Sequence, residues 1–96
     1  MKKISIVMAY YNRAKLLKST LATIAKSSYP NFEVIVMDDA SRKEERVEYL
    51  QQQYPFLRVF RVEEDEKWYI NPCIAYNKAI AKATGDIIII QNPALS

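Results

Sequence analysis

Two adjacent aspartates, Asp38 and Asp39, directly follow a run of apolar, mostly β-branched residues at positions 34–37. Such a run is typical of a strand that is buried in a parallel sheet. The carboxyl ends of these strands form the edge at which open α/β folds bind ligands. Because adjacent carboxylates repel each other and lose hydration when buried, we expect the chain to use one of them at a binding site.

Polar residues also follow two other apolar runs, which are predicted as strands at 4–9 and 87–90. The first run is followed by Tyr10-Tyr11-Asn12 and the second by Gln91-Asn92-Pro93. Since parallel strands end at a common edge, these residues are expected to gather beside the two aspartates and to form the ligand site.

The elements that position this edge follow from hydrophobic periodicity. Strands are predicted at 4–9, 32–37, 57–62 and 87–90, and helices at 13–27, 42–54 and 72–83. Ser41 and Glu44 match a capping box for the second helix, and the four isoleucines at 87–90 predict a strand buried on both faces. The order β-α-β-α-β-α-β predicts one α/β domain over residues 1–96, a Rossmann-like three-layer α/β/α fold with a four-stranded, mainly parallel sheet.

Composition excludes several kinds of chemistry. The 96 residues contain no histidine, which excludes Ser-His-Asp and Cys-His catalysis and His-ligated metals, and one glycine, which excludes a glycine-rich phosphate loop. A single cysteine and the absence of a long apolar segment predict a cytoplasmic protein without a membrane segment. The net charge of +3 is too small to indicate nucleic acid. The basic first third favours a solvated helix face over a phosphate site.

Three segments in order resemble a family 2 glycosyltransferase with the GT-A fold. Residues 5–13 resemble the opening strand and its Tyr-Asn-Arg loop, and residues 32–41 resemble the strand that ends in Asp-Asp-x-Ser. Residues 75–80 and 83–88 resemble the helix and strand that lead to the metal motif. The resemblance covers the whole chain and implies the nucleotide-sugar-binding half of a hexosyltransferase of polysaccharide biosynthesis.

The resemblance also implies roles for residues at the sheet edge. The carboxylate of Asp39 would accept a hydrogen bond from uracil, Asp38 would fix the loop or the ribose, and the Tyr11 ring would stack on the base. Arg13 would contact phosphate or serve the structure alone. The full set of nucleotide-binding residues implied in this way is Ala9, Tyr10, Tyr11, Asn12, Asp38 and Asp39.

The chain departs from the family pattern at the Asp-x-Asp motif, which holds Mg²⁺ or Mn²⁺ on the diphosphate. Those two positions fall on Asn92 and Ala94. Hard divalent cations prefer anionic oxygens, and Asn92 supplies one neutral carbonyl, so metal binding is expected to be weakened. Asn71, beside Trp68 and Pro72, is placed with Asn92 at the sugar or diphosphate end of the donor.

The length of the chain leaves three functions open. An inverting transfer needs a carboxylate base, and no residue here is assigned that role, so the catalytic residue is unknown and the chain is expected to be a fragment that binds a UDP-sugar without transferring it. The first alternative is a non-catalytic binding or assembly module with a lost donor site, which self-associates through an exposed sheet edge. The second is a doubly wound domain in which Asp38 and Asp39 accept a phosphoryl group with Mg²⁺.

Overall fold

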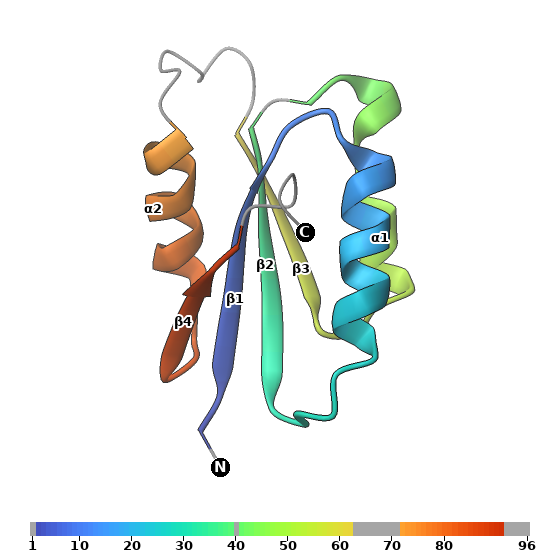
Figure 1. Ribbon diagram of the computed structural model, residues 1–96. Coiled ribbons are helices and arrows are strands. Elements are labelled where there is room, and N and C mark those ends of the chain that lie inside the picture. Colours follow the sequence, from blue (N-terminus) through green and yellow to red (C-terminus); the bar gives the residue numbers. More distant parts are fainter. Residues whose placement is uncertain (1, 40, 63–71, 92–96) are drawn as a thin grey trace.

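The computed structural model describes residues 2–39, 41–62 and 72–91. Four parallel strands form one sheet in the order β3-β2-β1-β4, so the first strand is a central strand and the last described strand lies at one edge (Figure 1). The strands are β1 (Ile4–Tyr10), β2 (Phe32–Asp39), β3 (Leu57–Val62) and β4 (Ile87–Ile90). The predicted parallel α/β architecture is confirmed.

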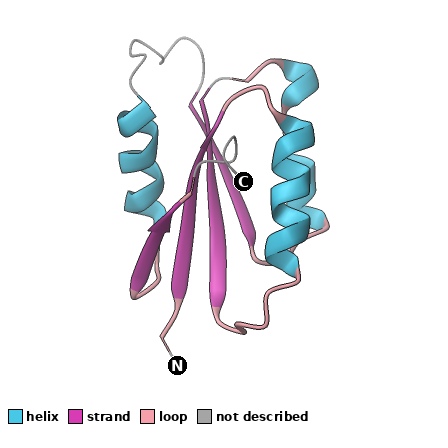
Figure 2. Cartoon of the chain, viewed as in Figure 1, coloured by secondary structure: helices cyan, strands magenta, loops and turns pink. Residues whose placement is uncertain are grey.

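Helices cover both faces of the sheet and complete the three layers (Figure 2). One face is covered by α1 (Ala14–Ala25) and two short 3₁₀ helices, η1 (Lys43–Glu45) and η2 (Glu48–Gln52). The other face is covered by α2 (Pro72–Lys82), which packs against β1 and β2. Within these described residues, no helix is long and apolar enough to span a membrane.

The alternation of side chains along β1 and β2 divides the core into two clusters. Met8 and Val36 point to the α1 face, where they pack with Leu17 and Leu21 of the helix. Val7 and Ile35 point to the opposite face, where they pack with Ala79 of α2. Because both faces of the central strands are buried, apolar residues run continuously along them, as the sequence predicts for a parallel sheet.

The helix predicted at 42–54 is wrong, because the structure divides this segment into η1 and η2 with extended backbone at Arg46 between them. The Ser41 hydroxyl does not cap a helix here, because it accepts a hydrogen bond from the amide of Asn12. Val47 and Leu50 are buried as predicted. The hydrophobic pattern therefore identified the buried residues but predicted the wrong backbone conformation. Contacts with distant residues outweighed the capping-box pattern.

The prediction that β4 is buried on both faces is also wrong. Its four isoleucines are 43–58% exposed, because β4 is an edge strand that has β1 as its one neighbour among the described strands. In the part of the chain that the structure describes, α2 packs mainly over β1 and β2 and α1 over the opposite side of the central strands. An apolar run of this composition fits a central strand or an uncovered edge equally well, so the sequence pattern alone did not distinguish them.

Candidate nucleotide site

The candidate site lies at the carboxyl edge of the sheet, where β1 and β2 end side by side. Tyr10, the last residue of β1, is in register with Asp38 of β2. β2 continues for one more residue to Asp39, two residues beyond its predicted end. The structure therefore brings two loops, 10–13 and 38–42, together, and these contain the residues after the first two strands that were predicted to meet at this edge.

Asp38 is fully buried, and both of its carboxylate oxygens have partners within the protein. Oδ1 accepts a hydrogen bond of 2.9 Å from the amide of Ser41, which closes the turn after β2. Oδ2 accepts one of 3.0 Å from Nη1 of Arg61 on β3. These contacts commit Asp38 to holding the turn and to an ion pair with Arg61.

Asn12 and Ser41 join the two loops. The amide of Asn12 donates a 2.9 Å hydrogen bond to Oγ of Ser41, and Oδ1 of Asn12 accepts one of 2.7 Å from the amide of Arg42. Asn12 has a φ of 50°, in the left-handed region that asparagine tolerates better than most residues. The Asn12 side chain thus holds the β1 loop against the β2 loop.

Tyr10 and Tyr11 are neighbours with opposite exposures. The Tyr10 side chain is buried on the α1 face, where its hydroxyl donates a 2.6 Å hydrogen bond to the carbonyl of Glu45. Burial raises the pKa of Tyr10 well above its ordinary value. The Tyr11 side chain is 50% exposed at the edge of the sheet. Of the two rings, that of Tyr11 is accessible to a ligand.

Glu45 caps the amino end of α1 from a distant part of the chain. Its Oε2 accepts a 3.1 Å hydrogen bond from the amide of Ala14, the first residue of the helix. A carboxylate at this position also interacts favourably with the positive end of the helix dipole. Since Glu45 occupies this position, the Ala14 amide is not available to a phosphate, and the predicted role of Arg13 stays a prediction.

Arg61 and Glu48 were not predicted from the sequence. Both belong to the site, because Arg61 pairs with Asp38 and Glu48 pairs with Arg61. Arg61 has a side chain only 10% exposed and pairs with both Asp38 and Glu48. In the β2–β3 register, Arg61 lies directly opposite Asp38. The sequence predicts strands at 32–37 and 57–62, and aligning them in this register places Arg61 beside the residue that follows the first of them, Asp38.

Several predicted site residues fall outside the described part of the chain. Asn71 and Asn92, with Trp68 and Ala94, lie in the segments 63–71 and 92–96, and the side chain of Asp39 is also outside it. Among the described residues, no three His, Cys, Asp or Glu side chains could together hold a metal ion. The predicted roles of these residues and the weak metal site therefore remain predictions.

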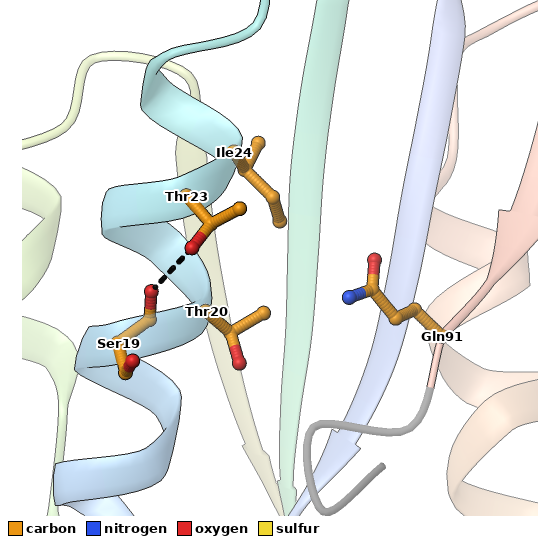
Figure 3. Close-up of a pocket in the computed structure, with 5 residues that line it drawn as sticks. All are labelled: Ser19, Thr20, Thr23, Ile24 and Gln91. Carbon is orange, nitrogen blue, oxygen red and sulfur yellow. Dashed lines mark hydrogen bonds between the residues drawn. The ribbon is translucent and has the colours of Figure 1, made fainter. Parts of the chain in front are cut away.

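A cavity of about 240 Å³ lies between α1 and the carboxyl end of β4, which is in register with Val7, three residues before the end of β1. Ser19, Thr20, Thr23 and Ile24 line it from the helix, and Gln91, the residue after β4, lines it from the sheet (Figure 3). The hydroxyls of Thr20 and Thr23 donate to the carbonyls of Leu16 and Ser19, respectively. The walls of the cavity are therefore mostly apolar.

The fold and this edge define an open α/β domain with polar residues at the carboxyl ends of parallel strands, where such domains bind ligands. The model of glycosyl transferase family 2 matches residues 5–92, so the chain belongs to this family. The amylovoran biosynthesis glycosyltransferase AmsB of Erwinia amylovora is 33% identical over 86 residues, which are 88% of this chain and 28% of AmsB.

Solved structures agree with the family assignment. The mannosyltransferase PcManGT from Pyrobaculum calidifontis, in complex with GDP-Man and Mn²⁺, is 30% identical with a TM-score of 0.77, covering 96% of this chain and 27% of that one. S. aureus TarS in complex with UDP is 26% identical with a TM-score of 0.76, covering 95% of this chain and 27% of that one. These relatives confirm the GT-A fold, and the 96 residues span little more than a quarter of each.

Proposed function

We propose that this chain binds the nucleotide of a nucleotide-diphosphate sugar, a UDP-sugar in the first instance, at the carboxyl edge of β1 and β2. The observation that carries the proposal is the joining of loops 10–13 and 38–42 through Asn12 and Ser41. It fixes two adjacent loops before any ligand arrives, which reduces the entropy cost of binding. PcManGT with GDP-Man and TarS with UDP support the same class of ligand.

Asp39 is the proposed base-reading residue. Asp38 is committed to Ser41 and Arg61, which leaves Asp39 as the second carboxylate at the end of β2. A carboxylate only accepts hydrogen bonds, so it suits a base that presents a ring N–H, as uracil and guanine do. Adenine presents a ring nitrogen acceptor at the equivalent edge and is expected to bind poorly. The half-exposed ring of Tyr11 would stack on the base.

The decisive experiment is calorimetric titration of the folded chain with UDP, GDP and ADP. Binding of UDP over ADP, abolished by Asp39→Ala, which removes the acceptor, supports the proposal, and preference for GDP would reassign the base. Asp86→Ala is the matched control, because it changes an exposed aspartate at the opposite end of the sheet. Absence of binding to all three nucleotides would contradict the proposal.

We also propose that the 96 residues bind the donor without transferring sugar. Inverting transfer needs a carboxylate that removes the proton of the acceptor hydroxyl. Of the described carboxylates, Asp38 and Glu33 are buried in internal hydrogen bonds, and Glu45 caps a helix. By analogy with AmsB, the complete reaction would serve polysaccharide biosynthesis. Sugar transfer by the purified chain would contradict this proposal.

We propose that a divalent metal ion contributes little to the affinity for the nucleotide. PcManGT was solved with Mn²⁺, whereas this sequence has Asn92 and Ala94 at the positions of the acidic metal motif. One neutral carbonyl is a poor ligand set for Mg²⁺ or Mn²⁺, so the diphosphate itself would provide most of the coordination. Titration of UDP with and without Mn²⁺ tests this, and an increase in affinity that depends on Asn92 would show that the amide suffices.

A non-catalytic assembly module is the second candidate function, and the exposure of β4 favours it. The four isoleucines of this edge strand present apolar side chains, and among the described strands its outer backbone edge has no neighbour. Such an edge can pair with a second copy of the chain. Nucleotide binding separates the two candidates, because only the first requires it.

A further inference from the structure

Arg61 is an almost buried residue of β3 that contacts Asp38 at the candidate site. It lies on β3 in register with Asp38 on β2, and its Nη1 donates a 3.0 Å hydrogen bond to Oδ2 of that carboxylate. Its Nη2 contacts Oε2 of Glu48 in η2. With 10% of its side chain exposed, Arg61 bridges the fully buried Asp38 and the partly exposed Glu48.

The partner of Arg61 is a fully buried carboxylate. The Asp38 side chain is 0% exposed, and its other oxygen accepts the hydrogen bond from Ser41 that closes the turn after β2. Without the guanidinium, Asp38 would keep a negative charge in the interior with one oxygen unpaired. The side chain would have to turn toward water or take up a proton, and either change would disturb the bond to Ser41.

That bond is the first step of a continuous path to the β1 loop. Ser41 accepts the hydrogen bond from the Asn12 amide, and Asn12 accepts one from the Arg42 amide. Asn12 is held with a φ of 50°, a conformation that depends on such contacts in a residue other than glycine. The path from Arg61 to the backbone beside Tyr11 therefore consists of three hydrogen bonds, from Arg61 to Asp38, from the Ser41 amide to Asp38 and from the Asn12 amide to the Ser41 hydroxyl.

We propose that Arg61 is a positioning residue of the nucleotide site, which holds both ligand-binding loops in place through Asp38 and touches no ligand itself. This inference rests on the proposed nucleotide binding at that edge. It assigns the two adjacent aspartates different tasks: Asp38 is the anchor that Arg61 neutralises, and Asp39 is the carboxylate left to meet the base.

The chain provides a matched control on the same strand. Arg58 of β3 also pairs with a buried carboxylate of β2, Glu33, at 3.2 Å, but at the opposite end of the sheet. Arg61→Met is expected to weaken UDP or GDP binding by about tenfold or more, as loss of a supporting residue does in other sites. Arg58→Met is expected to lower stability with unchanged affinity. Equal affinities for Arg61→Met and the wild type would overturn the proposal.

A rescue variant distinguishes positioning from direct contact. In Arg61→Met/Asp38→Asn, the amide oxygen still accepts from Ser41, while the unpaired charge is gone. The double variant is expected to recover affinity to within about threefold of the wild type, because the two groups act as one unit. An affinity as low as that of the single variant would show that Arg61 contacts the ligand. Arg61→Lys keeps the charge but not the planar guanidinium, so its nucleotide affinity is expected to lie between those of Arg61→Met and the wild type.

Amide hydrogen exchange measured by NMR without ligand separates this inference from the proposed function. Arg61→Met should lose protection at the amides of Ser41 and Asn12, and Arg58→Met should keep it. Unchanged protection at both amides would overturn the positioning role whatever binds. If the wild type bound neither UDP nor GDP but the amides lost protection, the loop-holding role would stand and the proposed function would fail.

Discussion

The hydroxyl of Ser5 on β1 donates a 2.6 Å hydrogen bond to Oε2 of Glu33 on β2. The same hydroxyl oxygen accepts a 2.8 Å hydrogen bond from the amide of Gly85, just before β4. Thr84 adds two further hydrogen bonds to the Glu33 carboxylate, from its amide at 2.8 Å and from its hydroxyl at 3.0 Å. A buried polar cluster therefore ties the edge strand to the central strands at the end of the sheet opposite the candidate site.

Glu33 should make stability depend on pH in the acid range. Burial raises its pKa, but hydrogen bonds from Ser5, Thr84 and Arg58 outweigh burial and lower the pKa from 4.5 to about 2. A carboxyl whose pKa is lowered by folding stabilises the fold above its unfolded pKa, and this contribution is lost as the pH falls from about 4.5 toward 2. The difference corresponds to roughly 3 kcal/mol at neutral pH.

Urea denaturation at a series of pH values between 6 and 2 measures this contribution. The wild type should lose stability more steeply below pH 4.5 than Glu33→Gln does, since the variant has no charge to lose at that position. Exposed Glu44→Gln controls for the removal of one negative charge. If the stability of the wild type and of Glu33→Gln fell in parallel with pH, the stability of the cluster would not depend on the ionised form of Glu33.

Gly85 is required by close packing. A Cβ at this position would lie 2.5 Å from Oγ of Ser5, 2.8 Å from its backbone nitrogen and 2.9 Å from the carbonyl oxygen of Lys3. Two of these atoms are backbone, so the strands would have to shift. Gly85→Ala should therefore cost about 1–3 kcal/mol of unfolding free energy, as overpacking does elsewhere.

The combination of Gly85→Ala with Ser5→Ala tests the cause. Removing the hydroxyl relieves the closest contact but leaves both backbone contacts, so the double variant should recover part of the loss at most. A Gly85→Ala variant as stable as the wild type in urea denaturation would show that the turn before β4 moves freely.

Tyr10 and Tyr11 should separate stability from binding. Tyr10→Phe removes the hydrogen bond to the Glu45 carbonyl and should cost about 1 kcal/mol of stability, with little change in nucleotide affinity. Tyr11→Ala removes a half-exposed ring and should leave stability nearly unchanged. It should weaken nucleotide binding by about 1–3 kcal/mol if the ring stacks on the base.

Thermal denaturation and calorimetric titration of the two variants provide the comparison. The neighbouring residues serve as each other's control, because they differ in exposure and not in type. A loss of affinity for Tyr10→Phe with none for Tyr11→Ala would reverse the assignment and would place the buried ring at the ligand.

Much of the fold could be predicted because it depends on local pattern. The runs 57–62 and 87–90 match β3 and β4 in full, and the amphipathic stretch around Leu17 and Leu21 gave α1 within two residues. The segment 42–54 could not be predicted in this way. Its conformation depends on Asn12 binding Ser41 and on Ala14 binding Glu45, contacts that join residues about 30 positions apart.

The candidate site was likewise predictable where it depends on local pattern and not where it depends on contacts between distant residues. The aspartates after β2 and the loop after β1 were predicted because each follows an apolar strand. The different roles of Asp38 and Asp39 could not be predicted, because they depend on Arg61, which lies 23 residues further along the chain. Only the pairing of β3 with β2 brings these residues together.

The exposed edge of β4 favours pairing with a second copy of the chain. Residues 87–90 carry no charge that would oppose pairing with another strand, and proteins usually protect edges with charged residues or proline. In an antiparallel pairing of two β4 strands, Ile88 would face Ile89 of the second copy, and the two strands would present identical apolar surfaces. The purified 96-residue chain should therefore self-associate as its concentration rises.

Sedimentation velocity over a range of concentrations measures this association, and Ile90→Lys should abolish it. Ile90 is the most exposed of the four at 58%, so the lysine should reach water without disturbing the fold. Tyr49→Lys is the control, because Tyr49 is 53% exposed on η2, away from β4. A wild type that stays monomeric at all concentrations would contradict the prediction. Loss of association in the Tyr49 variant alone would move the contact to the α1 face of the sheet.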